Sequence, residues 1–67
     1  MNNEGRFIIV HESPTGLRVA VNVKRILCVF EMPKSYMSEG RNARIFLNEG
    51  SELITEESFD EIGGMIR

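Results

Sequence analysis

Alternating hydrophobic and polar residues dominate the first third of the chain. Residues 7–11 form a short run rich in β-branched side chains, and from Leu17 to Val23 every odd-numbered residue is a large apolar one. This period of two is typical of strands with one buried face. Between the runs, Pro14-Thr15-Gly16 supplies a fixed φ and then a residue that tolerates positive φ, as a hairpin loop requires. We therefore predict that the first two strands pair in antiparallel orientation.

A third strand is predicted over residues 26–32, after a tight turn at residues 22–25. Its side chains are apolar at nearly every position, so we expect both of its faces to be buried and place it at the centre of the sheet. Pro33 ends this strand, because proline cannot donate to the hydrogen-bond ladder. Residues 33–42 then form the longest loop, which we expect to be flexible, and residues 1–5 are expected to be disordered.

The last third of the chain predicts a second hairpin and a helix. Residues 43–47 and 51–55 are its strands, and Asn48-Glu49-Gly50 fits a type I turn with glycine in the left-handed conformation. Ser58 and Glu61 have the spacing of a capping box, with Thr55 as an alternative cap. Apolar residues then recur at spacings of three and four, which predicts a helix face that covers the sheet, formed by Phe59, Ile62 and Ile66.

These elements define the expected fold class. It is mainly β (a β-rich α+β fold), with a small antiparallel sheet of about five strands and one short C-terminal helix. The two hairpins flank the central strand, and residues 1–67 form a single small domain. Since a chain of about 60 residues buries only about 60% of its unfolded surface, oligomerisation is the natural supplement to its small core. We therefore expect a homodimer or a larger assembly.

Composition restricts the function classes. Hydrophobic residues make up 42% of the chain and charged residues 27%, as in ordinary globular proteins. The longest apolar run has five residues, far short of the roughly 20 that span a bilayer. The first residues lack the basic and apolar segments of a secretory signal. We therefore expect a cytoplasmic protein without membrane contact. A single Cys28 excludes an internal disulfide framework and a multi-cysteine zinc site.

Charge is distributed unevenly along the chain. The net charge is −2, but basic residues are in excess up to residue 44 and acidic residues are in excess after it. Two interpretations stay open. The first is a pair of solvated faces of opposite sign. The second is a functional one, in which a basic face meets an anionic partner or the two halves are complementary between copies.

The sequence favours a protein without catalytic activity. His11, the only histidine, adjoins a predicted turn, where an exposed hydrogen-bonding role is the simplest interpretation. Cys28 lies in the most apolar stretch and is expected to be a buried, inert thiol. The carboxylates at the start of the helix are explained by capping, and paired acid–base work would need burial that exposed glutamates lack. Neither a phosphate-binding glycine loop nor metal-ligand spacing is found, so we expect no cofactor.

Binding is the remaining class of function. Tyr36 is a candidate for stacking on a base or filling a partner pocket, and the basic residues around it for contacting phosphates; the alternative for Tyr36 is a side chain folded over the edge of the core. The candidate binding residues are Lys24, Arg25, Lys34, Tyr36, Arg41 and Asn42. In addition, Phe30 or Phe46 is expected to face solvent and mark a self-association patch.

The order of elements resembles two small β families, the FlbD-type flagellar and swarming-motility proteins and the LytTR-type DNA-binding domains of bacterial response regulators. The segments that carry the resemblance are Val21-Asn22-Val23, Ile45 to Ser51 and Glu57 to Ile62. It implies an antiparallel β fold with a C-terminal helix in a bacterial or phage protein. LytTR-type domains bind DNA through loops, which would point to Lys24, Arg25 and residues 33–42.

Two functions therefore compete. The first is a small non-catalytic, regulatory β module that acts by protein–protein contact or self-association, through edge-strand pairing or an apolar sheet patch. The second is a DNA-binding regulator that uses the basic part of the chain. Phosphate contacts weaken steeply with salt, whereas apolar association changes little, so salt dependence separates the two.

Overall fold

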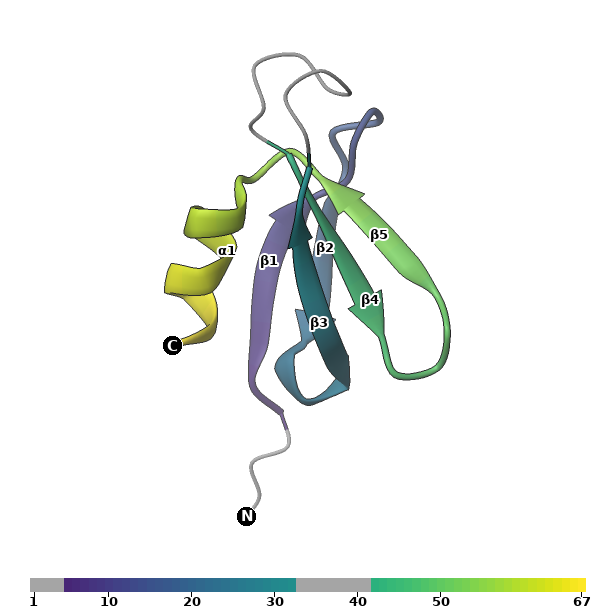
Figure 1. Cartoon of the computed structure of the whole chain (residues 1–67), viewed down its shortest axis with the longest axis vertical. Coiled ribbons are helices and arrows are strands. Elements are labelled where there is room, and N and C mark those ends of the chain that lie inside the picture. Colours follow the sequence, from purple (N-terminus) through teal and green to yellow (C-terminus); the bar gives the residue numbers. More distant parts are fainter. Residues whose placement is uncertain (1–4, 33–41) are drawn as a thin grey trace.

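The computed structural model describes residues 5–32 and 42–67. Two strands precede a short 3-10 turn, and three more strands and a helix follow it (Figure 1). The elements are β1 (Phe7–His11), β2 (Arg18–Asn22), η1 (Val23–Arg25), β3 (Ile26–Glu31), β4 (Ala43–Leu47), β5 (Glu52–Thr55) and α1 (Phe59–Ile66). The predicted mainly β fold with a C-terminal helix is thus confirmed. None of the helices among these residues is long and apolar enough to span a membrane.

The strands form two antiparallel sheets instead of the single sheet that we expected. β1 pairs with β2, and β3, β4 and β5 form the second sheet in that order. The separation arises at η1, where the Asn22 side chain accepts a hydrogen bond from the backbone N–H of Lys24 at 3.0 Å. This cap turns the chain out of the first sheet before β3 begins. The tight turn predicted at residues 22–25 is therefore the point where the chain changes sheets.

The two sheets meet at one corner. An isolated bridge joins Glu12, just beyond the end of β1, to Thr55 at the end of β5. Beside it, the N–H of Glu56 donates to the carbonyl of His11 at 2.8 Å, and the N–H of Ser13 donates to the carbonyl of Ile54 at 2.9 Å. β1 therefore contacts β2 along one edge and the end of β5 along the other.

The prediction that β3 is central is wrong, because β4 holds that place and β3 is an edge strand. Val29 and Ile26 of β3 pack against the core, but Leu27 is 69% exposed and Phe30 is 53% exposed. An apolar run predicts burial on both faces only where a second layer covers the outer one. No element among residues 5–32 and 42–67 forms such a layer over this face.

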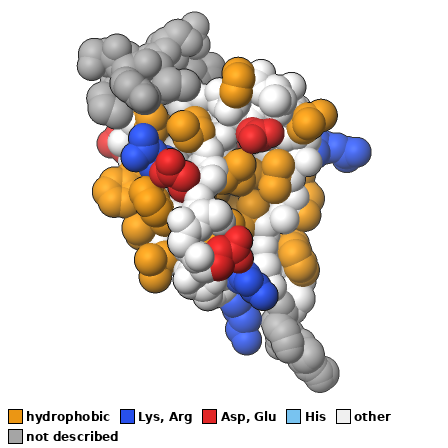
Figure 2. All heavy atoms as spheres, turned by 90° about the vertical axis from the view of Figure 1, so that its right-hand side faces the viewer, with side chains coloured by type: hydrophobic (Ala, Val, Ile, Leu, Met, Phe, Trp, Pro, Cys, Tyr) orange, Lys and Arg blue, Asp and Glu red, His pale blue; other side chains and the backbone are white. Residues whose placement is uncertain are grey.

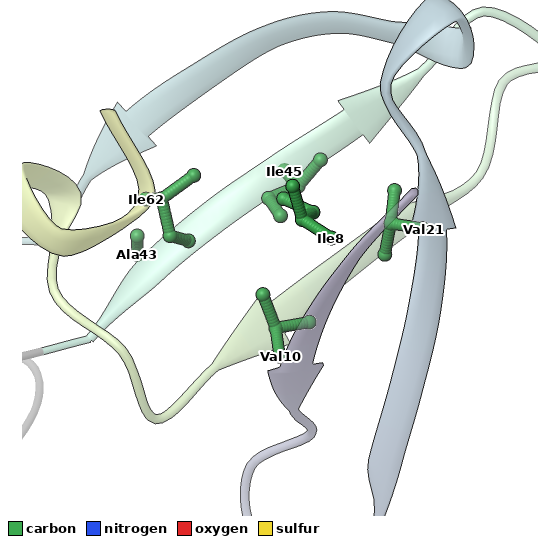
Figure 3. Packing of buried hydrophobic residues seen from close by; sticks show 6 residues of the cluster. All are labelled: Ile8, Val10, Val21, Ala43, Ile45 and Ile62. Atoms are coloured by element: carbon green, nitrogen blue, oxygen red, sulfur yellow. The ribbon is translucent and has the colours of Figure 1, made fainter. Parts of the chain in front are cut away.

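The core lies between the two sheets and is closed by α1. Its buried residues come from β1, β2, β4 and the helix, and Figure 3 shows them together: Ile8, Val10, Val21, Ala43, Ile45 and Ile62. Ile45 and Ile62 have no exposed surface at all. α1 contacts β1, β3 and β4, so it covers the side where the two sheets are not hydrogen-bonded to each other.

The turns and the helix cap agree with the sequence predictions. Gly16 and Gly50 have φ of 76° and 104°, the left-handed region that a side chain would strain. Ser58 and Glu61 form the capping box, with reciprocal bonds of 2.9 and 3.1 Å. The expected role of Phe59 is wrong, since it is 41% exposed. The short helix instead buries the face centred on Ile62, with Met65 and Ile66 packed against the core.

Candidate functional site

One face of the three-stranded sheet is apolar and turned away from the core. Because Ile45 is buried in the core, its neighbours on β4, Arg44 and Phe46, point to the opposite face. The pairing register adds residues of β3 and β5 to that side. We call this surface the Phe30 face, and it consists of Cys28, Phe30, Arg44, Phe46, Glu52 and Ile54.

An aromatic pair lies at the centre of the Phe30 face. The rings of Phe30 and Phe46 are 5.4 Å apart with an interplanar angle of 62°, an edge-to-face arrangement. The Arg44 guanidinium lies 6.0 Å from the Phe46 ring centroid, and its Nε is 3.6 Å from Glu52 Oε1. This Nε is buried without a hydrogen bond, so the pair with Glu52 is purely an ionic contact. The predicted solvent-facing phenylalanine is confirmed for Phe30, whereas Phe46 is half-buried.

The prediction for Cys28 is also wrong. We expected a buried thiol, but the side chain is exposed and the thiol is free. Cys28 alternates with Val29, which packs against the core, so it lies on the uncovered Phe30 face. The β3–β4 register also has an irregularity between Ile26 and Cys28. A bulge of this kind breaks the alternation of a strand, and here it leaves Leu27 and Cys28 exposed one after the other. The five-residue apolar run carries no sign of this bulge.

A groove separates the free edges of β2 and β5. It has a volume of about 340 Å³ and contains mostly apolar side chains of both sheets. In Figure 2, which shows the β5 side of the molecule, hydrophobic side chains gather in the middle of that face. We call this surface the β2–β5 groove, and it is lined by Phe7, Val19, Ala20, Val21, Asn22, Arg25, Leu47, Glu52 and Leu53.

The backbone of β2 presents hydrogen-bonding groups to the groove. Leu17 and Val23, at either end of β2, bond to the β1 side: Glu12 N–H donates to Leu17 O, and Val23 N–H donates to Arg6 O. In an antiparallel pair the N–H and C=O of one residue point to the same side, and those of its neighbour point to the other. The N–H and C=O groups of Arg18 and Ala20 therefore point away from β1, toward the groove. Asn22 is the N-cap of η1, so its carbonyl belongs to the hydrogen bonding of that turn.

The edge of β5 has the same property. Leu47 N–H donates to Ser51 O at 2.9 Å, so the odd-numbered residues of β5 point toward β4. The backbone groups of Glu52 and Ile54 consequently point away from the sheet. Ile54 O accepts the bond from Ser13 at the corner. At Glu52, no strand among the described residues pairs with this edge of β5.

Two charged side chains line the groove, Arg25 and Glu52. At the end of the groove, Arg25 Nη1 lies 3.2 Å from Glu49 Oε1, in an exposed ion pair that joins η1 to the β4–β5 turn. Glu52 Oε1 lies 3.6 Å from Arg44 Nε, so both charged lining residues have a partner of opposite charge within the chain.

Of the six candidate binding residues, the structure brings two together. Lys24 and Arg25 are exposed neighbours in η1 at one end of the groove. Asn42 has a structural role instead, because its side-chain amide donates to Thr55 O at 2.7 Å and so joins the start of β4 to the end of β5. Lys34, Tyr36 and Arg41 lie outside the described residues, as do the predictions for residues 1–4 and 33–41.

His11 and Glu57 form a contact that the sequence analysis did not identify. His11 Nδ1 lies 2.6 Å from Glu57 Oε2, and the backbone N–H of His11 donates to Glu57 Oε1 at 2.9 Å. Burial raises the pKa of the Glu57 carboxyl, but the hydrogen bonds from the His11 side chain and backbone, and from its own backbone, lower that pKa below its usual value of 4.5. The partners are 46 positions apart in the sequence, so no local pattern revealed this contact.

The His11–Glu57 pair holds the end of β1 against the segment that leads into α1. Glu57 is only 14% exposed, unlike the surface carboxylate that capping predicted. His11 meets its expectation as a hydrogen-bonding residue beside the turn, with 42% of its side chain exposed. Within the described ranges, no three His, Cys, Asp or Glu side chains are grouped in a way that would hold a metal ion.

Comparison with protein-family models, curated proteins and solved structures finds no match for this chain. The resemblance to FlbD-type proteins and LytTR-type domains therefore stays a prediction. The described residues offer two apolar surfaces to a partner, the Phe30 face and the β2–β5 groove.

Proposed function

We propose that this chain is a non-catalytic β module that acts by association with protein, and first of all with further copies of itself. The observation that carries this proposal is the exposure of large apolar side chains on strands of both sheets. Leu27 and Phe30 of β3 are more than half exposed, and so is Phe7 of β1. Isolated exposed apolar residues are ordinary, but contiguous ones on strand edges mark interaction surfaces.

The energetics favour association. Each square ångström of apolar surface removed from water contributes about 25 cal/mol, and a chain of this size has few other ways to add to a small core. The inner layer consists of six fully or largely buried apolar residues. Covering the exposed apolar strands with a second copy adds a further apolar layer without a change of fold.

Protein is favoured over nucleic acid as the partner by the state of the basic residues. Of the two described basic candidates, Arg25 already faces Glu49, and the carboxylate of Glu52 lines the same groove. A DNA backbone would meet these carboxylates as well as Lys24. Nucleic-acid binders present a clear basic excess on the binding surface, and the net charge here is −2.

Molar mass in solution tests the proposal. We expect light scattering on the full chain, from micromolar to millimolar concentration, to show a dimer or larger species. A monomer throughout this range would overturn the proposal.

The same measurement on three variants, each with one exposed phenylalanine replaced by serine, identifies the surface that associates. Phe7→Ser changes the β2–β5 groove, Phe30→Ser changes the Phe30 face, and Phe59→Ser on α1 is the control of comparable exposure. The proposal requires that one of the first two variants weakens association and that the control does not. Salt-sensitive binding of a mixed DNA duplex that is lost in Lys24→Ala/Arg25→Ala would instead favour the DNA-binding regulator.

A further inference from the structure

We propose that α1 is a hinged lid over the core, held at its two ends by polar contacts with the two ends of β1. Protonation of Glu57 releases this lid while the strands of the two sheets stay paired. The inference goes beyond the proposed function, because it concerns a single chain and needs no second copy.

The first argument is the placement of the contacts that hold α1. The helix lies alongside β1 (Figure 1). Just before β1, Arg6 Nη2 donates to the carbonyl of Met65 in the last turn of α1 at 2.7 Å. At the other end of β1, the Nδ1 and backbone nitrogen of His11 lie 2.6 and 2.9 Å from the carboxylate oxygens of Glu57. Within the described part of the chain, no hydrogen bond joins residues 59–64 to either sheet.

The second argument is the weakness of α1 away from the sheets. It has eight residues, and isolated helices shorter than about 12–15 residues are marginal in water. Gly63 and Gly64 lie inside it, and glycine is among the least favourable helix residues. A Cβ at either position would meet no atom of the surrounding structure within 4 Å, so contact with the sheets does not require glycine there. We therefore expect α1 to unfold when it leaves the sheets.

The third argument is the surface that α1 covers. Ile62 is fully buried, and Figure 3 shows it pointing from α1 toward the buried side chains of the sheets. Met65 and Ile66 pack on the same core and keep part of their surface exposed. The strand pairs and the corner bonds of Ser13 and Glu56 do not involve α1. Opening of the lid would therefore uncover an apolar surface without breaking a strand pair.

The connection between β5 and α1 supplies a hinge at Ser58. Thr55 is fully buried, and its hydroxyl donates to the carbonyl of Glu57 at 2.9 Å. This bond keeps residues 55–57 together at the end of β5. Ser58 follows with an extended backbone, φ −80° and ψ 167°, and α1 begins directly after it. Rotation at Ser58 changes the direction of α1 without moving β5, and the closed direction is the one fixed by the contacts with β1.

Glu57 is the group that makes the lid sensitive to acid. Burial raises the pKa of its carboxyl, but the hydrogen bonds from His11 and from its own backbone lower that pKa below 4.5. The contact is therefore fully present above the pKa of the unfolded chain and is lost as the pH falls below 4.5. The other titratable groups on the surrounding segments are carboxylates without a hydrogen bond to Glu57: Glu12 after β1, Glu56 beside Glu57, and Asp60 and Glu61 in the first turn of α1.

Native-state hydrogen exchange of the full chain, followed by NMR from neutral pH to about pH 3.5, tests the lid. Ile62 and Ile66 report on α1, and Val21 and Leu47 report on the two sheets. Protection is compared with that of the unfolded peptide at each pH. We expect the protection of α1 to fall at least roughly tenfold relative to that of the sheets in acid. Equal protection of α1 and the sheets at every pH would show that α1 leaves only by global unfolding, which overturns the proposal.

Two variants each remove the contact at one end of the lid. Glu57→Gln should give α1 at neutral pH the low protection that the parent has in acid, and should remove most of the pH dependence. Arg6→Ala should lower the protection of α1 several-fold throughout the pH range. The controls Glu56→Gln and Arg18→Ala remove exposed groups of the same charge and should leave α1 unchanged. The same loss in Glu57→Gln and Glu56→Gln would reveal a general effect of charge and overturn the role of the contact.

A third variant acts in the opposite direction and cannot be mistaken for general destabilisation. Gly64→Ala, at an exposed position with free space around it, should raise the protection of α1 about fivefold and leave that of the sheets unchanged. An unchanged α1 would contradict opening by unfolding of the helix. These ratios should not depend on protein concentration, so a chain that stays monomeric removes the proposed self-association and leaves the lid intact.

Discussion

The Phe30 face and the β2–β5 groove are both apolar and exposed, but they differ in what else they offer a partner. On the Phe30 face the aromatic rings pack on each other and the only cation, Arg44, faces Glu52 on the same surface. In the groove, backbone groups of two strand edges border the apolar lining, which includes one basic and one acidic side chain, Arg25 and Glu52. Apolar area supplies affinity without direction, whereas edges and charges specify how a partner is oriented.

Exposed apolar surface alone therefore does not identify an interface. Phe30 and Phe7 are exposed to almost the same extent, yet Phe30 lies on the face of one sheet, whereas Phe7 lines a groove between two strand edges. If the groove is the interface, changes on the Phe30 face should affect mainly its local packing.

Truncating a core residue that lies beneath both surfaces should have the largest effect on stability. Ile45 is fully buried at the centre of β4, below the Phe30 face and beside the strands of the groove. Ile45→Ala leaves a cavity, and we expect a loss of about 2–5 kcal/mol in the free energy of unfolding. Chemical denaturation measures it. Ile54→Ala, on the opposite face of the same sheet, is the control and should cost clearly less; equal losses would contradict the assignment of Ile45 to the core.

Loosening the corner between the two sheets should have the second largest effect. The carboxylate of Glu57 accepts bonds from the backbone and the ring of His11, and hydrogen bonds to charged groups contribute about 1.5–3 kcal/mol. Glu57→Gln should lower the free energy of unfolding by about that amount at neutral pH. The exposed Glu56→Gln is the control, and a similar loss in both variants would show that the contact contributes nothing specific.

The same contact predicts a pH dependence. Because the pKa of Glu57 is lowered below 4.5 in the folded chain, its contribution to stability is fully present above the pKa of the unfolded chain. It is lost as the pH falls below 4.5 and through the lower pKa of the folded state. Thermal unfolding between pH 7 and pH 3 should therefore show a steeper loss of stability for the parent than for Glu57→Gln. Parallel curves would contradict the lowered pKa.

A substitution on the Phe30 face should have a smaller effect on stability, and it tests whether this face takes part in association. Phe30→Ala removes one ring of the edge-to-face pair, which contributes about 0.5–1.5 kcal/mol beyond its buried area. We expect a stability loss of that order with no change in the dissociation constant of the dimer. Denaturation and light scattering on the same samples measure both quantities. A weakened dimer with unchanged stability would assign the interface to the Phe30 face instead.

The smallest effect is expected for the ion pair across the end of the groove. Arg25→Gln breaks the exposed contact with Glu49, and exposed pairs contribute only about 0.2–1 kcal/mol. The change in stability should disappear at high salt, because exposed charges are screened. Thermal denaturation at low and high salt checks this, with Arg67→Gln at the C-terminus as a control that lies in no ion pair of the described residues.

Local structure was predictable from the sequence because its causes are local. Alternation over residues 17–23 placed β2, the glycines at 16 and 50 marked the two hairpins, and Ser58 with Glu61 marked the start of α1. Each of these signals depends on residues only a few positions apart. The candidate site was less accessible: exposed Lys24 and Arg25 were identified, but the groove beside them consists of residues from strands distant in the sequence.

By itself, the sequence determined the number, type and order of the strands and the helix, since hydrophobic period, turn chemistry and capping act within single segments. Only the tertiary structure decided which strands are edges. An apolar strand such as β3 has the same local pattern whether or not a second layer covers it, so Leu27 and Cys28 could not be recognised as exposed. The groove and the His11–Glu57 contact likewise arise from the packing of two sheets against each other, which joins residues that no local pattern connects.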